Sequence, residues 1–306
     1  MDPAQSTALV TVFGLGSSWG TFTLGPIIRQ VTEDVAWGMS RHPGLLARPH
    51  HLMVDGPLDP NLDPDSDPED PYGPPRVRFI LPHALPSTSL VRTLAAQQGT
   101  PLAVTGRLDI HRKEFELALN IWDTGPPNLL YCAWEQGDSD TLLPTLARHT
   151  VGMARALTGL EIDEPDDVEE RTRAVFGTAS WGAFEAYASA TDKIRNLQVG
   201  SGGARPTDIP RLLCSALTTD PNYDRPRVLL LEHATRYLGQ ASVDYAQTLL
   251  DGVNTLRGDR LVYGLLRFES LLVLDKRQVA GQLLADLRKR FPGAAALDGA
   301  AARLAG

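Results

Sequence analysis

Apolar and polar residues alternate along the chain between residues 115 and 122. In an extended chain, four apolar side chains of this stretch fall on one face: Phe115, Leu117, Leu119 and Ile121. Such alternation is typical of a β-strand that is buried on one side only. The pattern therefore predicts a strand with one face in the core and the other face toward solvent.

Two further apolar runs flank this strand, at 101–110 and 129–134, and polar turns separate them from it. Together the three runs predict an antiparallel meander, and helices must cover its apolar face. A helix with Leu90, Val91 and Leu94 at helical spacing precedes the meander, and Gly99 is a stop signal for it.

The beginning of the chain predicts the order strand, loop, helix, strand. These elements are expected at 8–13, 14–20, 24–39 and 45–54. A strand at 76–81 follows, and a helix at 141–160 closes the first domain. The fold class that these elements predict is α+β, with a small mixed sheet and flanking helices.

Strand patterns end after residue 162, and helical patterns with short connections continue to the end of the chain. Breaks at Pro221 and Pro292 lie 71 residues apart (292 − 221), close to two tetratricopeptide periods of about 34 residues. A third break, at Gly258, falls near their midpoint. The sequence therefore predicts an all-α domain of stacked helical hairpins.

The predicted organisation is an α+β domain at 1–162, a linker at 163–179 and a helical repeat domain at 180–306. Within the first domain, residues 55–75 are rich in proline and acidic residues. Such a segment cannot bury an apolar face or complete a hydrogen-bond ladder, so we predict an exposed, mobile loop there.

Charge and composition exclude several classes of function. The net charge of −8 and the pI of about 5.4 argue against binding to a nucleic-acid backbone, which needs clustered Lys and Arg. No apolar stretch approaches the roughly 20 residues of a membrane span, and no signal peptide is apparent, which predicts a cytoplasmic protein. Cys132 and Cys214 lie in apolar stretches and are expected to be buried free thiols.

The first half of the chain resembles the TolB-type amino-terminal domain, which is also found in FlgO-like proteins and in bacterial regulators with tetratricopeptide repeats. The motifs that carry the resemblance are the turn at 40–45, the helix end at 94–99, the strand with a central glycine at 104–106, the segment at 121–125 and Trp134. The second half is similar to a degenerate tetratricopeptide array that lacks the characteristic Trp and the Gly-Tyr pair. Relatives are often periplasmic or membrane-anchored. The resemblance implies no catalytic residues, cofactor or metal.

Residues 16–20 read Gly-Ser-Ser-Trp-Gly and fit the nucleophile elbow G-x-S-x-G, with Ser18 as the nucleophile. Such hydrolases take an oxyanion-hole N–H from the loop of an earlier strand, and only one strand precedes Ser18, which favours a structural turn. Gly14 and Gly16 also match the start of a dinucleotide fingerprint, but Trp19 occupies the place of the third glycine.

Metal-binding patterns are incomplete. Asp63, Asp65 and Asp67 mimic a calcium loop, but Pro68 and Pro74 replace its glycine and its bidentate glutamate. His42, His50 and His51 are near each other in the sequence, but they do not have the spacing of metal ligands. In a strand, His50 and His51 point to opposite faces, so the two side chains do not readily bind one ion.

Two residue groups that resemble nucleic-acid motifs are interpreted as structural. The tryptophans, which we expect mainly in core and edge packing, form no stripe with basic residues: Trp19, Trp37, Trp122, Trp134 and Trp181. Arg288, Lys289 and Arg290 complement the dipole of a helix C-terminus.

The functional prediction is a non-enzymatic interaction or scaffold module that binds a partner protein or peptide through its helical repeats. The alternatives are a serine hydrolase that uses Ser18 and a regulatory appendage of a bacterial signalling system. The sequence leaves the partner and the oligomeric state open.

Overall fold

The computed structural model shows a mixed α+β protein whose chain forms two compact units. The sheet unit extends to Phe184 and the helical unit begins at Glu185, so the division falls within one helix. The structure describes residues 7–17, 24–50, 53–54, 78–79, 88–125, 128–198, 204–240, 242–257 and 260–305.

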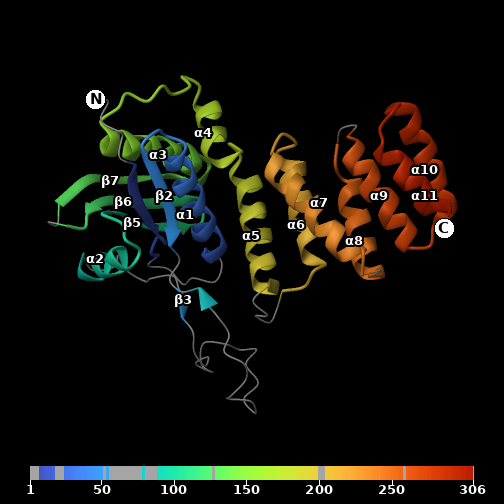
Figure 1. Ribbon diagram of the computed structural model, residues 1–306, viewed down its shortest axis with the longest axis horizontal. Helices are drawn as coiled ribbons and strands as arrows, with labels where there is room; N and C mark the ends of the chain where they lie inside the picture. Colours follow the sequence, from blue (N-terminus) through green and yellow to red (C-terminus); the bar gives the residue numbers. More distant parts are fainter. Residues whose placement is uncertain are drawn as a thin grey trace, which may run out of the picture. The chain divides into compact units, whose positions relative to one another are not determined.

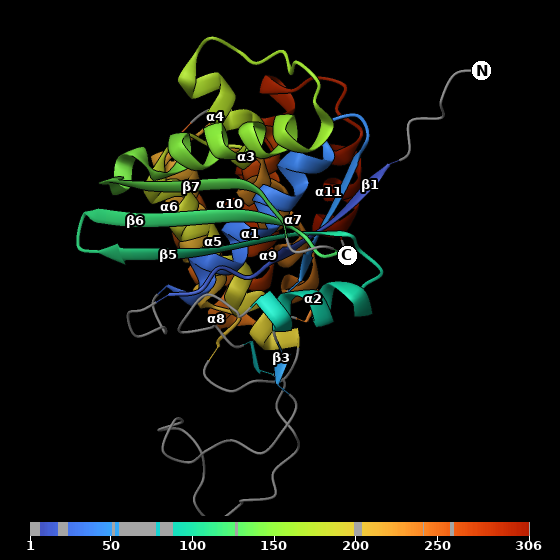
Figure 2. The same cartoon turned by 90° about the vertical axis from the view of Figure 1, so that its left-hand side faces the viewer.

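The sheet unit is built on a five-stranded mixed sheet with the strand order β2-β1-β5-β6-β7 (Figures 1 and 2). β1 pairs in parallel with both β2 and β5, whereas β5, β6 and β7 form the predicted antiparallel meander. A separate antiparallel pair joins β3 (Met53–Val54) to β4 (Arg78–Phe79). The five strands of the main sheet are β1 (Ala8–Phe13), β2 (Leu45–His50), β5 (Leu102–His111), β6 (Glu114–Asp123) and β7 (Asn128–Asp138).

One face of the sheet carries the apolar side chains that the alternation predicted. Phe115, Leu117, Leu119 and Ile121 of β6 are all buried. α3 (Leu142–Thr158) packs on β7 and against α1 (Gly25–Ser40), which in turn packs on β1 and β2. A short 3-10 turn, Ser139–Thr141, leads from β7 into α3. The predicted one-sided strand is confirmed.

α2 (Thr88–Gln97) covers part of the opposite face. Its Val91 and Ala95 join Phe13 of β1 and Ala103 of β5 in a small apolar cluster. Gly99 follows with a φ of +67°, a conformation that glycine adopts without strain. The predicted stop of this helix at Gly99 is therefore confirmed.

β7 is an edge strand, and its side chains on the α2 side of the sheet remain exposed. Trp134 is 62% exposed, and Cys132, two residues earlier on the same face, is also exposed. The expectation that Cys132 is buried was wrong, because α2 does not extend over this edge of the sheet. Trp37 on α1 is 49% exposed, so it is not part of the buried core.

Residues 163–179, which the sequence indicated as a linker, contain α4 (Val168–Phe176). α4 packs against α3 and α1. Asp167 caps its start, since the carboxylate accepts hydrogen bonds from the N–H groups of Glu169 and Glu170. Gly177, with a φ of +77°, ends it.

In its described residues, the helical unit consists of most of α5 (Trp181–Gln198) and six further helices, which form three hairpins (Figure 1). The first helices of the hairpins begin at Asp208, Val243 and Arg277, and these starts are 35 and 34 residues apart (243 − 208 and 277 − 243). Successive hairpins pack on one another. The hairpins are α6 (Asp208–Thr219) with α7 (Asp224–Leu238), α8 (Val243–Asn254) with α9 (Leu261–Val273), and α10 (Arg277–Arg290) with α11 (Ala296–Ala305).

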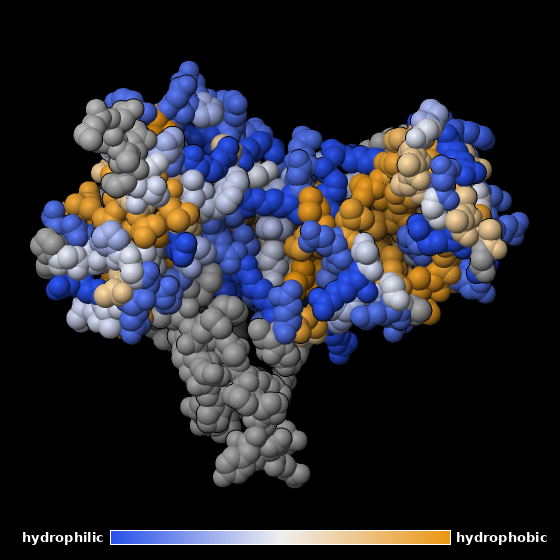
Figure 3. All heavy atoms as spheres, viewed as in Figure 1, coloured by the Kyte–Doolittle hydropathy of each residue, from blue (hydrophilic) through white to orange (hydrophobic). Residues whose placement is uncertain are grey.

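Two apolar clusters hold the helical unit together. The first joins α5 to α9 and includes Leu213, Leu230 and Leu249, and the second joins α8 to α11 around Phe268. Apolar side chains also lie at the surface of these helices (Figure 3). Among the described residues, none of the helices combines the length and the apolar character that crossing a bilayer requires.

Candidate functional site

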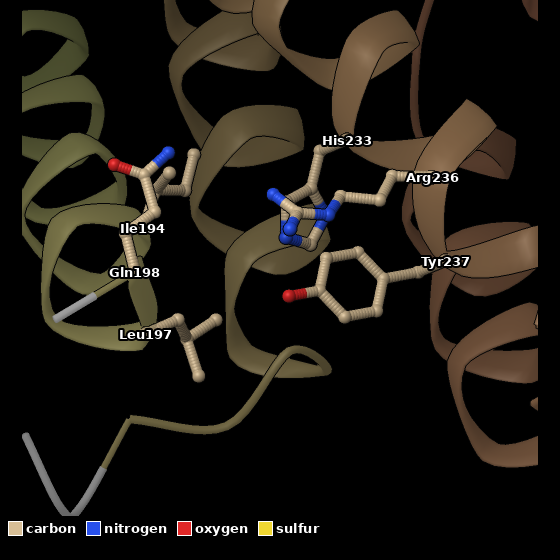
Figure 4. Close-up of a pocket in the computed structure, with 6 residues that line it drawn as sticks. All are labelled: Ile194, Leu197, Gln198, His233, Arg236 and Tyr237. Carbon is tan, nitrogen blue, oxygen red and sulfur yellow. The ribbon is translucent and has the colours of Figure 1, made fainter. Parts of the chain in front are cut away.

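A small pocket lies between the end of α5 and the second half of α7, inside the helical unit. Its volume is about 40 Å³, and one water molecule needs about 10–15 Å³ on this measure. In Figure 4, side chains from α7 extend toward those of α5 across the pocket. The six lining residues are Ile194, Leu197, Gln198, His233, Arg236 and Tyr237.

Helical periodicity places the α7 residues at this site. Leu230 and Ala234 turn one face of α7 into the core, and His233 lies on the same face, one turn from Leu230. Tyr237 continues this face at the rim of the core, whereas Arg236 lies at its exposed edge. The pocket therefore has a buried imidazole at its base and a guanidinium group at its opening.

His233 is 6% exposed, and its Nδ1 lies 2.6 Å from the hydroxyl oxygen of Tyr245 on α8. The rings of Tyr237 and Tyr245 also contact the imidazole, at centroid distances of 4.4 and 5.4 Å. Burial, and then the positive charge of Arg236, lowers the pKa of His233 to about 4. Burial also raises the pKa of Tyr245. Both groups are therefore neutral at pH 7.

The second imidazole nitrogen, Nε2 of His233, is buried and has no hydrogen-bond partner among the described residues. A buried polar group without a partner costs about 1–3 kcal/mol of stability. His233 is one of the residues that line the pocket, and no partner is placed for this nitrogen among the described residues.

Arg236 supplies the positive charge of the pocket. Its guanidinium carbon lies 6.0 Å from the centroid of the Tyr237 ring, within reach of a cation–π interaction. None of the six described lining residues is acidic. The pocket thus combines a positive charge and polar groups with apolar walls from Ile194 and Leu197.

A second histidine cluster lies in the sheet unit, between β7 and α3. The hydroxyl oxygen of Tyr131 lies 2.7 Å from Nδ1 of His149, and Nε2 of His149 lies 3.5 Å from a carboxylate oxygen of Glu135. Arg148 binds the same carboxylate oxygen at 2.9 Å. Burial, and then Arg148, lowers the pKa of His149. These contacts run from strand to helix, so the cluster fixes α3 against β7.

A larger hollow of about 240 Å³ lies in the sheet unit, beside the turn after α1. Burial, and then Arg41, lowers the pKa of His42 there. Two arginines, Arg155 and Arg171, neutralise the neighbouring Glu164 at 2.7 and 3.3 Å. The hollow is lined by His42 and Pro43 and by five residues at and after the end of α3: Thr158, Leu160, Glu161, Ile162 and Asp163.

The Gly-rich loop after β1 departs from a nucleophile elbow in its described part. Gly16 continues along β5, because its N–H donates to the carbonyl of Gly106, and α1 begins only at Gly25. The buried Ser17 donates to Asp109 at 2.9 Å. Ser18, Trp19 and Gly20 lie outside the described residues, so the hydrolase alternative stays a prediction.

The incomplete metal-binding patterns of the sequence lie mostly outside the described residues. Asp63, Asp65, Asp67 and His51, with the whole of 55–75, lie outside the described residues. In the described part of the chain, no group of three or more His, Cys, Asp or Glu side chains is placed to hold a metal ion. Cys214 is buried, as expected, and burial raises the pKa of its thiol to about 12.

No protein-family model and no curated protein matches this sequence.

Sequence reasoning missed the pocket at His233. The available signal was a histidine on the apolar face of a helix, in register with Leu230 and Tyr237. That pattern predicts a buried histidine, but its partner Tyr245 lies on the next helix, and only the packing of the helices brings the two together.

Proposed function

We propose that this protein is a non-enzymatic interaction module that binds a partner protein or peptide through its helical hairpins. In this proposal, the hairpins form a degenerate tetratricopeptide-like array, and the sheet unit is a TolB-type platform. The observation that carries the proposal is the stack of three hairpins whose repeat of 34–35 residues follows from the helix starts at 208, 243 and 277. Arrays with this period bind peptides and helices of other proteins on their surfaces.

Exposed apolar side chains on α7 support this reading. Val228 is 56% and Leu231 is 43% exposed, and residues three apart lie on the same face of a helix. Clustered apolar side chains at a surface are typical of interaction sites. Arg227 and Glu232 flank this stretch of α7 and provide charged neighbours along the helix.

The proposal can be tested by photo-crosslinking in cells of the source organism. A photoreactive amino acid is placed at Leu231 of the full chain, and covalent adducts are analysed by mass spectrometry. We expect one discrete protein adduct, and we expect Val228→Asp to reduce its yield. Val168→Asp makes the same change at an exposed valine of α4 in the sheet unit and should leave the yield unchanged.

Absence of any discrete adduct, or equal loss in both aspartate variants, would contradict binding through α7. The hydrolase alternative is examined separately with a fluorophosphonate probe on the purified chain. Labelling that disappears in Ser18→Ala would show that the protein is an enzyme and would overturn the non-enzymatic proposal.

A further inference from the structure

The two edges of the main sheet differ in how open they are to a further strand. β2, at one edge, has 6 residues and contains Pro49, and both a short edge strand and a proline oppose the addition of another strand. β7, at the other edge, has 11 residues and contains no proline, lysine or arginine. An edge strand without such protection pairs readily with another extended chain.

The outer side of β7 offers main-chain groups along a regular stretch. After an irregularity near its start, residues 131–138 pair one-to-one with β6, from Ile121 to Glu114. In an antiparallel ladder, alternate residues direct their N–H and C=O groups away from the partner strand. No strand of the described chain pairs with β7 on that side, and no residue of β7 is buried. These groups are therefore open to pairing with a further strand.

The side chains beside this edge favour a strand with two different faces. On the α2 side, Trp134 is 62% exposed and Cys132 is also exposed, so apolar side chains of an added strand would gain contacts there. On the α3 side, Glu135 and Arg148 form an ion pair at the surface, which favours polar side chains. An alternation of apolar and polar residues is thus the pattern that fits this edge.

The end of β7 adds a requirement for charge. Glu114 and Asp138 lie directly opposite each other in the ladder, and both residues are exposed. Like charges in such a pair are destabilising, and no ion pair joins either carboxylate to another described residue. A Lys or Arg at the adjacent end of an added strand offsets this repulsion.

A second copy of the chain does not meet these requirements. Its β7 has no Lys or Arg to place beside Asp138, and each copy carries a net charge of −8, which repels the other copy. We propose instead that the outer edge of β7 binds an extended segment of a partner protein as an added strand, with apolar residues beside Trp134 and a basic residue beside Asp138. This surface lies in the sheet unit, so the proposal goes beyond binding through the helical hairpins.

The test is hydrogen–deuterium exchange of the full chain, read by mass spectrometry over β7. The probes are short peptides with blocked ends, in which valine alternates with threonine. One peptide carries lysines at its amino end and a second carries them at its carboxyl end, and each has a counterpart with glutamates instead. We expect one lysine peptide to slow exchange in β7 saturably, with a Kd on the order of millimolar, and to leave β2 unchanged. Lysines at the amino end identify antiparallel addition, because they then lie beside Asp138.

N-methylation of alternate peptide residues separates main-chain pairing from adhesion of an apolar peptide. Methyl groups on the residues whose N–H faces β7 should abolish the effect, whereas methyl groups on the intervening residues should preserve it. Equal results for the two methylated peptides, equal slowing by the glutamate peptides, or no saturable slowing by either lysine peptide would each overturn the proposal. Slower exchange in β7 as the protein is concentrated without peptide would identify a second copy as the occupant and would overturn it too.

Asp138→Lys reverses the charge of an exposed side chain, so the fold should be retained. We expect about tenfold weaker binding of the lysine peptide and tighter binding of its glutamate counterpart. The matched control is Glu232→Lys on α7, an exposed glutamate of the helical unit that gives the same change in net charge. Equal weakening in both variants would show that only net charge matters and would contradict a contact at Asp138.

Trp134→Thr removes the exposed ring and keeps a residue that favours strands. We expect about tenfold weaker binding of the lysine peptide, and unchanged binding would contradict the apolar contact. Because β7 and α7 lie in different units, a failed titration leaves the crosslinking result at Leu231 intact, and a failed crosslink leaves the titration intact.

Discussion

Protonation of His233 is expected to destabilise the helical unit in acid. The imidazole is buried against Tyr245 and beside Arg236, and folding lowers its pKa from 6.5 to about 4. The folded state therefore binds a proton less readily than the unfolded state. The stabilising effect of the neutral form is complete above pH 6.5, and it is lost as the pH falls from 6.5 through 4.

The magnitude follows from the two pKa values. A pKa difference between 6.5 and about 4, at about 1.4 kcal/mol for each pH unit, corresponds to about 3 kcal/mol of unfolding free energy. About 2 kcal/mol of this should already be lost at pH 5. In a unit whose total stability is of the order of 5–15 kcal/mol, such a change is readily measured.

The assay is urea denaturation between pH 7 and pH 4, with wild type compared to His233→Gln. The glutamine carbonyl can still accept the Tyr245 hydroxyl proton, but it does not titrate. Far-UV circular dichroism reports the helices of both units, whereas all five tryptophans lie at or before Trp181 and report the sheet unit alone by fluorescence. We expect a smaller loss of stability in acid for the variant by circular dichroism, and no change in the fluorescence transition.

The comparison between wild type and variant isolates His233, because other titrating groups contribute equally to both proteins when they are distant from the site. If the two proteins lose helical stability in parallel between pH 6.5 and pH 4, His233 is not buried as a neutral imidazole.

Three further outcomes are expected from the packing. Gly106→Ala should destabilise the sheet unit by about 1–3 kcal/mol, because the new Cβ would lie 2.4 Å from a carbonyl oxygen of β6. The change is measured by urea denaturation followed by tryptophan fluorescence. Gly14→Ala, in which the nearest atom to the new Cβ would be 3.9 Å away, should have little effect, and equal destabilisation by both substitutions would refute a steric cause. Asp167→Ala removes the cap of α4 and should cost about 1 kcal/mol, whereas Asp167→Asn should retain most of that stability in the same assay. A maleimide should label the exposed Cys132 in the native chain and label the buried Cys214 only in denaturant; native labelling of both thiols would contradict the packing of α6.

Much of the architecture followed from local patterns in the sequence. The alternation from Phe115 to Ile121 predicted a one-sided strand, and all four apolar residues are buried. Gly99 predicted the end of α2, and the breaks at Pro221 and Pro292 lie between the two helices of their hairpins. These features depend on periodicity and on backbone preferences that act over a few residues, so they are legible without any tertiary information.

Tertiary packing alone decided the strand order, the exposure of individual side chains and the candidate site. Cys132 lies in an apolar run, yet it is exposed because β7 is an edge strand that α2 does not cover. The pocket forms because α7 brings His233 against Tyr245 of α8 and places Arg236 opposite the end of α5. Such contacts join residues on different helices, and their distances depend on how whole helices pack rather than on any spacing along the chain.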